Sequence, residues 1–202
     1  MRMKALTASS DDTDESLMRL IQQGSHQAFA FLVRRHTDRF YASAFRMCGN
    51  QSEAEDMVQD AFLKIWNRPD LWKDDRGAKF TTWFYRILLN QNTDRLRKHR
   101  NVTDDNSMLP SIADSNPTPE KQAVLNEEQR LLEEALAALP ERQRTALTLC
   151  FYEGLSNADA AGVMGVKVKA LESLLMRAKA GLRDFINRPA NNLEKGERYA
   201  AR

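Results

Sequence analysis

Apolar residues recur along most of the chain at the spacing of three and four residues that is typical of an amphipathic helix. The clearest run extends from Ala54 to Trp66, where the apolar side chains share one face of a helix. No stretch alternates apolar and polar residues for long enough to predict a strand. The same spacing predicts further helices at 17–23, 25–48, 80–96, 124–139, 140–153, 156–164 and 168–182. The sequence therefore predicts an all-α fold.

Residues that favour helix ends mark several of these boundaries. Ser52, with Glu55 three residues later, forms the pattern of a capping box at the start of the clearest helix. Ser25 is placed to open the long helix before it, while Gly24 and Gly49 are placed to end helices. We therefore expect short connections between the helices of the first half of the chain.

The segment 101–120 interrupts the helical pattern. It contains three of the six prolines, many Asn, Asp and Ser residues and few large apolar ones, a composition typical of an extended linker. Beyond it, a helix is predicted to start at Pro140 and to carry Leu147, Cys150 and Phe151 on one face. We therefore expect these segments: a disordered tail 1–14, a first domain 15–100, an acidic linker 101–120, a second domain 121–187 and a polar tail 188–202.

The second domain contains a compact pair of predicted helices. Ser156 is placed to cap the first of them, Gly165 to close it, and Val168 lies near the start of the second. Two helices joined by a tight glycine-containing turn form a helix-turn-helix, whose second helix presents its N-terminal residues to the major groove of DNA. A plain helical hairpin is the alternative. The outward positions suited to phosphates and base edges are Lys167, Lys169, Glu172, Ser173, Met176, Arg177, Lys179 and Arg183.

Charge adds two separate basic blocks to this picture. The net charge is only +2, but residues 76–100 contain seven Lys or Arg and one acidic residue, and residues 141–202 contain eleven and seven. Residues 101–140, between these blocks, contain two basic and eight acidic residues. This pattern indicates two contacts with a polyanion, separated by a segment that avoids it. Solvated helix faces are the alternative.

The first basic block also interleaves aromatic residues with cations. Trp83 and Tyr85, for example, lie beside Arg86 in the sequence. This mixture suits single-stranded nucleic acid, whose bases stack on aromatic rings while cations neutralise its phosphates. The preceding loop, 66–79, is suited to accept an extruded base. The alternative places several of the aromatic and apolar side chains in the core, namely Phe80, Trp83, Phe84 and Ile87.

Hydropathy and cysteine content exclude several classes of protein. No apolar run is long enough to span a bilayer, and the N-terminal stretch lacks the apolar core of a signal peptide. Cys48, Cys150 and the three histidines provide neither a disulfide framework nor the spacing of a metal site. We therefore expect a cytoplasmic protein without membrane insertion and without a metal or other cofactor.

Several strings of the sequence together resemble the bacterial extracytoplasmic-function sigma factors, group 4 of the sigma-70 superfamily of RNA polymerase subunits. The resemblance covers both predicted domains, over about residues 15–186. The strings that carry it are GSHQAFAFLVRRH (24–36), AEDMVQDAFLKIW (54–66), FTTWFYRILLNQNTDRLR (80–97) and LPERQRTALTLCFYEGLSNADAAGVMG (139–165).

This resemblance implies an alternative sigma factor, not an enzyme, that binds core RNA polymerase and directs transcription initiation at specific promoters. The first domain (region 2) is then expected to bind polymerase and to recognise and melt the minus-ten promoter element. The second domain (region 4) is expected to bind the minus-thirty-five element. The implied partners are the clamp of the largest polymerase subunits, double- and single-stranded promoter DNA and an anti-sigma factor, and the free protein is expected to be a monomer.

The resemblance also implies roles for individual residues, through their positions in the matching strings. The residues implied in polymerase binding are Asp56, Gln59, Asp60, Phe62 and Trp66, with the two aromatic rings as an apolar anchor. The alternative places Phe62 and Trp66 in the core of their own domain. The residues implied in minus-ten recognition are Arg76, Lys79, Trp83, Arg86, Asn90, Arg95, Arg97 and Lys98, where Asn90 contacts a base edge. Those implied in minus-thirty-five recognition are Ser156, Lys167, Lys169, Glu172, Ser173, Met176, Arg177 and Lys179.

The predicted recognition helix departs from the family pattern in one place. Where relatives commonly have Thr-Val-Lys-Ser-Arg, this chain has Ala170-Leu171-Glu172-Ser173-Leu174. A carboxylate at Glu172 would accept a hydrogen bond from cytosine N4 and would repel a nearby phosphate. We therefore expect Glu172 to help specify a cytosine and Leu174 to belong to the core.

Two other classes of function stay open on the sequence alone. A one-component helix-turn-helix regulator of transcription would need a ligand pocket or a dimer interface in residues 1–100, and would have no use for the face between Asp56 and Trp66. A helical nuclease or hydrolase would need a metal site. Asp56 and Asp60 have no third carboxylate or histidine on the same helix face, which disfavours that class.

Overall fold

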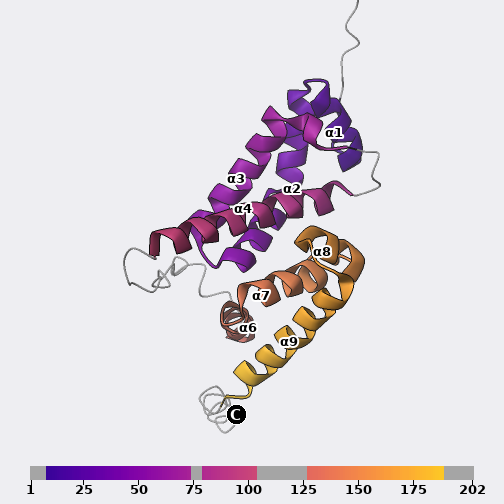
Figure 1. Ribbon diagram of the computed structural model, residues 1–202. Coiled ribbons are helices and arrows are strands. Elements are labelled where there is room, and N and C mark those ends of the chain that lie inside the picture. Colours follow the sequence, from indigo (N-terminus) through magenta and orange to yellow (C-terminus); the bar gives the residue numbers. More distant parts are fainter. Residues whose placement is uncertain (1–7, 74–78, 104–126, 189–202) are drawn as a thin grey trace, which may run out of the picture. The chain divides into compact units, whose positions relative to one another are not determined.

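The computed structural model describes residues 8–73, 79–103 and 127–188. Within these ranges all regular secondary structure is helical, which confirms the all-α prediction (Figure 1). The chain divides into two compact units, residues 1–109 and 110–202, and the division falls inside the predicted linker 101–120. Residues 104–120 of that linker, and of the predicted tails residues 1–7 and 189–202, lie outside the described residues.

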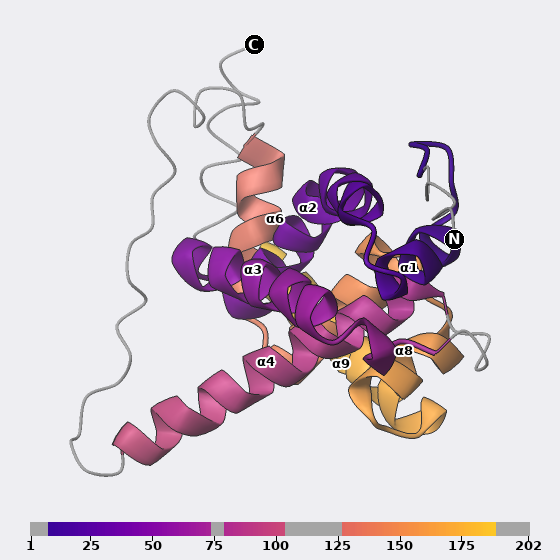
Figure 2. The same ribbon diagram turned by 90° about the horizontal axis from the view of Figure 1, so that it is seen from above.

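The first unit is a helical assembly in which every helix contacts at least one of the others. Its elements are α1 (Asp14–Gln22), α2 (His26–Cys48), α3 (Gln51–Asn67), the short 3-10 helix η1 (Pro69–Leu71) and α4 (Phe80–Thr103). α1 packs on α2, α2 and α3 lie side by side, and α4 crosses both (Figures 1 and 2). The η1 helix lies in the region that the sequence predicts to be a plain loop.

Aromatic side chains from α2, α3 and α4 form the core of the first unit. The ring of Phe40 stacks on that of Phe84, with 3.7 Å between centroids, and Tyr85 meets Phe40 edge to face. The centroids of Phe62 and Phe80 lie 4.9 Å and 5.8 Å from that of Phe84. All five side chains are buried. Because such ring pairs stabilise a fold beyond simple apolar burial, this cluster fixes α4 against α2 and α3.

Three of the predicted helix ends in this unit are confirmed, and one is wrong. Gly24 follows the end of α1 with φ of 87°, and its N–H bonds to the carbonyl of Ile21 at 2.9 Å. Ser25 caps α2, and Gly49 ends it in the left-handed conformation, with φ of 75°. The prediction that Ser52 caps α3 is wrong, because Asn50 does so by accepting a hydrogen bond from the N–H of Glu53 at 3.0 Å. Asn and Ser are equally favourable at this position. The end of α2 at Gly49 leaves Asn50 in the extended conformation that a cap requires.

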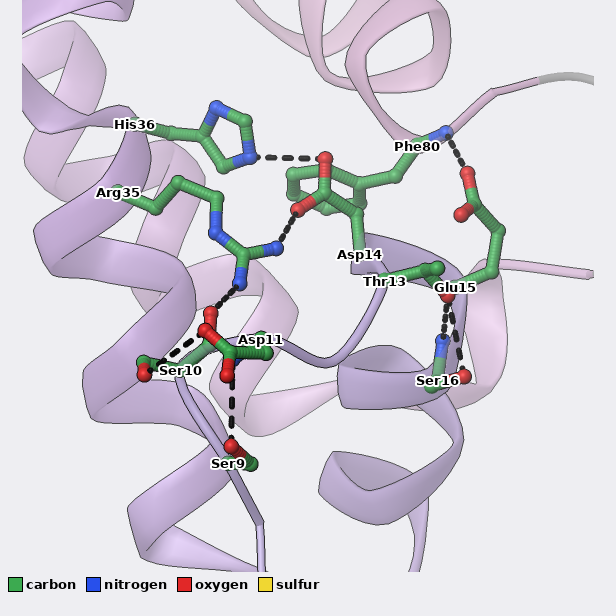
Figure 3. Close-up of polar contacts among 10 residues, drawn as sticks. All are labelled: Ser9, Ser10, Asp11, Thr13, Asp14, Glu15, Ser16, Arg35, His36 and Phe80. Atoms are coloured by element: carbon green, nitrogen blue, oxygen red, sulfur yellow. Dashed lines mark hydrogen bonds and ion pairs between the residues drawn. The ribbon is translucent and has the colours of Figure 1, made fainter.

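The first turn of α1 is fastened to α2, although α1 starts inside the predicted tail (Figure 3). The Asp14 carboxylate accepts a hydrogen bond from Arg35 at 2.7 Å, and its other oxygen lies 2.8 Å from Nε2 of the buried His36. Arg35 also donates to the carbonyl of Ser10. Burial would raise the pKa of Asp14, but the hydrogen bonds from His36 and Arg35 outweigh it and lower that pKa below its ordinary value of 3.8.

This network predicts a pH-dependent contribution of Asp14 to stability. A carboxyl group with a lowered pKa stabilises the fold above its unfolded pKa, and that contribution is lost as the pH falls through its folded pKa. We therefore expect Asp14→Asn to unfold more easily than the wild type near neutral pH, and the difference to shrink as the pH falls below about 4. Urea unfolding of both proteins across this pH range, followed by circular dichroism, measures the effect. A difference that stays constant with pH would contradict it.

The second unit packs its helices around a cluster of leucines. Its elements are α6 (Glu127–Ala137), α7 (Glu141–Leu147), the π-helical turn η3 (Thr148–Tyr152), α8 (Asn157–Met164) and α9 (Val168–Ile186). Leu136, Leu139 and Ala178 belong to the buried cluster, and Leu182 packs against it. A Cβ on Gly181 would lie 2.7 Å from Cδ2 of Leu139. The glycine therefore allows α9 to approach Leu139 closely.

The apolar face predicted after Pro140 is only partly correct. α7 starts directly after Pro140 and Leu147 is buried, but Phe151 is 57% exposed. The reason is the π-helical turn, in which the N–H of Glu153 bonds to the carbonyl of Thr148 at 3.1 Å, five residues earlier instead of four. The wider turn moves Phe151 out of the apolar face to the surface.

α8 and α9 form the predicted helix-turn-helix. The hydroxyl of Ser156 caps α8 by accepting a hydrogen bond from the N–H of Asp159 at 3.1 Å, and Gly165 ends α8 with φ of 63°. Only residues 165–167 separate the two helices. On the inner side of α9, Leu171 and Leu175 are buried. A short turn with a left-handed glycine and a second helix anchored on one side is the arrangement that the motif requires.

Candidate functional site

The exposed side of α3 carries a stripe of acidic, polar and apolar residues. Asp56, Gln59 and Asp60 are exposed, and their spacing of three and four residues puts them on one side of the helix. Leu63, on the next turn, is 55% exposed, although large apolar side chains are usually buried. Trp66, which is half-buried, continues the stripe. We refer to these five residues as the α3 face.

Phe62 does not belong to the α3 face, although the family resemblance implies an anchor at this position. Its side chain is only 6% exposed, and its ring lies in the aromatic core beside Phe84. The accessible apolar position is Leu63, which the sequence pattern did not single out. Successive residues of a helix point about 100° apart, so a difference of one position separates the core side of α3 from its surface.

Trp66 is positioned by two side chains of α2. The ring centroid of His26 lies 4.5 Å from that of Trp66, and the ring centroid of Phe29 lies 5.0 Å from it. These contacts cover one part of the indole ring, and the rest is accessible. Trp66 is therefore a packing partner within its own domain that also leaves apolar surface accessible.

A second candidate surface follows α4. Lys79, Arg86, Asn90 and Arg97 are exposed, and Trp83 is half-buried. At about 100° per residue these positions fall within about 60° of one another, so they lie on one side of the helix. We refer to these five residues as the α4 face. Its cations suit phosphates, its indole ring suits stacking with a base, and its amide suits a base edge.

Three residues predicted for minus-ten recognition are not placed on the α4 face. Arg76 lies outside the described residues, and Lys98 lies in α4 with a side chain that is outside them. Arg95 is described, and it follows Lys79 by sixteen positions, or about 160° around the helix. It therefore points away from the α4 face and toward α3.

Arg95 forms a structural ion pair instead of a surface for phosphate. Its Nη1 lies 2.7 Å from Oε2 of Glu53, and its side chain is 21% exposed. Its Nη2 also donates to Oδ1 of the buried Asn92 at 3.2 Å. The guanidinium group of Arg95 therefore joins α4 to α3 and is not placed to contact DNA.

This assignment predicts that Arg95 and Arg97 differ in their effects on stability. Arg95→Ala removes the cation beside the half-buried Glu53 carboxylate, and we expect it to lower the free energy of unfolding by about 1–3 kcal/mol. Arg97 is 73% exposed and pairs with Asp94 at 3.4 Å. Arg97→Ala should therefore change stability by less than about 0.5 kcal/mol. Urea unfolding of the two variants measures the difference, and equal losses would show that the Glu53 contact has no special role.

The third candidate surface is the exposed side of α9. Every outward position predicted from the sequence is exposed, namely Lys167, Lys169, Glu172, Ser173, Met176, Arg177, Lys179 and Arg183. We refer to these residues as the α9 face. The large apolar side chain of Met176 is 67% exposed. Leu174, which was expected to lie in the core, is only half-buried.

Local contacts define the roles of Ser156 and Lys179 further. The hydroxyl of Ser156 donates to the Asp159 carboxylate at 2.6 Å, in addition to capping α8. Its hydroxyl group therefore stabilises the N-terminal end of α8 in this structure.

The ammonium of Lys179 lies over the exposed ring of Phe151, 4.8 Å from its centroid. This cation–π contact joins η3 to the α9 face, which the sequence could not indicate because its apolar spacing predicts a buried Phe151.

The described parts of the chain offer neither a metal site nor a membrane span. Among residues 8–73, 79–103 and 127–188, no three or more His, Cys, Asp and Glu side chains are grouped so that they could hold a metal ion. None of the helices in these ranges is long and apolar enough to cross a membrane.

Two family matches cover the two units separately. Residues 32–102 match the family Sigma-70 region 2, and residues 129–182 match the family Sigma-70, region 4. The first match contains the α3 face and the α4 face, and the second contains α8 and most of α9. The two matches therefore include nearly all of the candidate surfaces.

Known proteins resemble the chain over most of its length. The RNA polymerase sigma factor NccH of Alcaligenes xylosoxydans is 34% identical over 175 residues, which cover 84% of this chain and 92% of NccH. The ECF RNA polymerase sigma factor SigW of Bacillus subtilis is 29% identical over 172 residues, 81% of this chain and 91% of SigW. A crystal structure of the sigma factor RpoE with the anti-sigma factor NepR from Bartonella quintana superimposes with a TM-score of 0.64, at 26% identity, covering 78% of this chain and 95% of that chain. These relatives are transcription initiation factors rather than enzymes.

Proposed function

Because the chain belongs to the extracytoplasmic-function sigma factors, the alternative sigma factors that direct transcription initiation, we propose that it binds core RNA polymerase and contacts promoter DNA with both of its units. The observation that supports this most strongly is that the region 2 and region 4 matches fall, in this order, on two separate units. Each unit exposes a helix face rich in cations. Two linked DNA contacts allow two separated promoter elements to be bound together.

The α3 face is the proposed contact with polymerase. Leu63 and Trp66 supply exposed apolar surface, and Asp56 and Asp60 lie beside them as a polar rim. Protein interfaces commonly have this arrangement, in which a few large side chains provide most of the affinity. The two carboxylates favour a basic surface on the partner. The clamp of the largest polymerase subunits is the partner that the family resemblance implies.

The α4 face is the proposed contact with the melted minus-ten element. Lys79 and Arg97 would neutralise phosphates, Trp83 would stack on an exposed base, and Asn90 would form hydrogen bonds with a base edge. Unpairing a base costs a few kcal/mol, and stacking on an aromatic ring returns about 1–3 kcal/mol per base. Contacts available only to the single strand would therefore favour opening of the duplex.

The α9 face is the proposed contact with the minus-thirty-five element. Lys167 and Lys169 lie at the start of the helix, where they would bind phosphates and fix its position in the major groove. Glu172 and Ser173 follow on the exposed side, within reach of base edges. This unit would read sequence in duplex DNA, whereas the first unit reads a single strand.

The remaining features of the proposal concern regulation and location. RpoE of Bartonella quintana is seen in complex with an anti-sigma factor. We infer that an anti-sigma factor also controls this chain, and that it covers the α3 face when it does. We further propose that the protein acts in the cytoplasm, is a monomer when free, and has no catalytic activity or cofactor of its own. The family membership supports a sigma factor over the one-component regulator and over the helical nuclease or hydrolase.

Footprinting of a holoenzyme reconstituted from this protein and purified bacterial core polymerase tests the proposal. We expect protection of duplex DNA at an upstream element and permanganate-reactive thymines at a downstream element. Core polymerase alone is the control and should give neither. Protection of a duplex element by this protein without any binding to core polymerase would contradict the proposal.

A further inference from the structure

The two ends of α1 contact the first part of the connection between α3 and α4 and the first residue of α4. Near the C-terminal end of α1, Nε2 of Gln22 donates to the carbonyl of Pro69 at 3.1 Å and to the carbonyl of Trp72 at 3.0 Å. At its N-terminal end, Oε1 of Glu15 accepts a hydrogen bond from the N–H of Phe80 at 3.3 Å (Figure 3). One short helix therefore holds both the exit from η1 and the entry into α4.

These contacts give backbone groups at the ends of η1 and α4 a hydrogen-bond partner on α1. The N–H of Phe80 belongs to the first residue of α4 and has no acceptor within its own helix. A carboxylate near the N-terminus of a helix also interacts favourably with the helix dipole. The carbonyls of Pro69 and Trp72 lie at the two ends of η1, and that of Pro69 also accepts a hydrogen bond from the N–H of Trp72 at 3.3 Å. Gln22 therefore joins the two ends of η1 with a single amide group.

α1 is itself anchored in the first unit, so it can hold η1 and the start of α4 in position. Leu17, Met18 and Ile21 are buried on its inner side. Its first turn is fastened to α2 by the contacts of Asp14 with Arg35 and His36. The polar contacts of Glu15 and Gln22 therefore link η1 and the start of α4 to a part of the first unit that is fixed by packing.

We propose that Gln22 and Glu15 are positioning residues for recognition of the minus-ten element, an inference that rests on the proposed function. Lys79, the first residue of the α4 face, precedes Phe80 directly, so the Glu15 contact lies at the point where that face begins. α1 holds Pro69 and Trp72 in the first part of the connection between α3 and α4, and it holds Phe80 at the start of α4. It thereby fixes the position in which this connection leads into the α4 face. Neither Gln22 nor Glu15 needs to touch DNA for this effect.

Gln22→Ala, with Gln23→Ala as its matched control, provides the first test. Both glutamines are exposed at the same end of α1, so neither change should disturb the core. Holoenzymes made with each variant are compared on two templates, an active promoter and the same promoter with one minus-ten base changed. We expect Gln22→Ala to reduce the ratio of transcription between these templates by about tenfold, which corresponds to the loss of two hydrogen bonds. Gln23→Ala should leave the ratio unchanged, and both variants should bind core polymerase like the wild type.

Glu15 provides a second and independent test. Glu15→Ala removes the acceptor for the Phe80 N–H, and should reduce the same ratio. Glu15→Gln keeps an oxygen at the same position, and should restore most of it. If Gln22→Ala and Glu15→Ala lower transcription from both templates by the same factor, the residues have only a general structural role and the inference is wrong. If the wild type itself fails to support transcription with core polymerase, the proposed function is wrong instead.

Discussion

Replacing both Asp56 and Asp60 with lysine is expected to weaken binding to core RNA polymerase by at least about a hundredfold, since like charges brought together at an interface cost several kcal/mol. Both residues lie on the α3 face, on the same side of the helix as the exposed side chain of Leu63. A partner that accepts two carboxylates there presents cations, and the variant would place lysines against them. Because both positions are exposed, the fold should be unaffected.

A second double variant separates this effect from a general change of charge. Asp11→Lys combined with Asp38→Lys makes the same change at two exposed positions of the first unit outside the α3 face. We expect it to bind core polymerase within about threefold of the wild type, because isolated surface charges contribute little. Fluorescence anisotropy with labelled protein measures both affinities, and circular dichroism verifies the fold. If both double variants weakened binding to core polymerase equally, the assignment of the α3 face as the polymerase contact would be wrong.

Glu172→Lys is expected to change the preferred minus-thirty-five sequence. The side chain is exposed on the α9 face, near the start of the recognition helix. If its carboxylate accepts a hydrogen bond from a cytosine N4 group, lysine removes that contact and favours a guanine or a phosphate instead. A mismatched base pair typically costs about 1–3 kcal/mol, so preference for the cytosine should fall by roughly fivefold to a hundredfold.

Asp184→Lys is the control for this second prediction. Asp184 is also exposed on α9, but it lies twelve residues further along, about 120° around the helix. The substitution makes the same change in charge, and it should strengthen binding to any duplex without altering the preferred sequence. Selection of bound sequences from a randomised minus-thirty-five element, repeated for each holoenzyme, compares the two. If the wild type and Glu172→Lys selected the same sequence, the assignment of Glu172 to base recognition would be wrong.

The spacing of apolar residues is sufficient to predict most of the helices, but not which residues lie at the margin of each buried face. Phe62 and Leu63 are neighbours, and both are large and apolar. Periodicity alone leaves open which of them the aromatic core of α2 and α4 buries. Arg95 is different, because its angular distance from Lys79 can be counted in the sequence. That angle of about 160° is enough by itself to separate Arg95 from the α4 face.

Other features depend on contacts between distant parts of the chain or on local geometry that composition does not reveal. The contact of Gln22 with Pro69, and that of Glu15 with Phe80, join residues separated by 47 and 65 positions. Nothing in the local pattern of either residue indicates its partner. The π-helical turn that exposes Phe151 is equally invisible, because its sequence continues the apolar spacing of an ordinary α-helix. The prediction of Ser52 as a cap is wrong because serine and asparagine serve that position equally well.

Transcription from a pool of random promoter sequences by purified core polymerase, with and without this protein, tests the central claim most directly. We predict new transcripts only when the protein is present, and their templates should share two sequence elements separated by a constant spacing. The downstream element should become reactive to permanganate, and the upstream one should stay double-stranded. Binding of the protein to duplex DNA without binding to core polymerase, and without any new transcript, would contradict the claim that it is a promoter-specificity subunit.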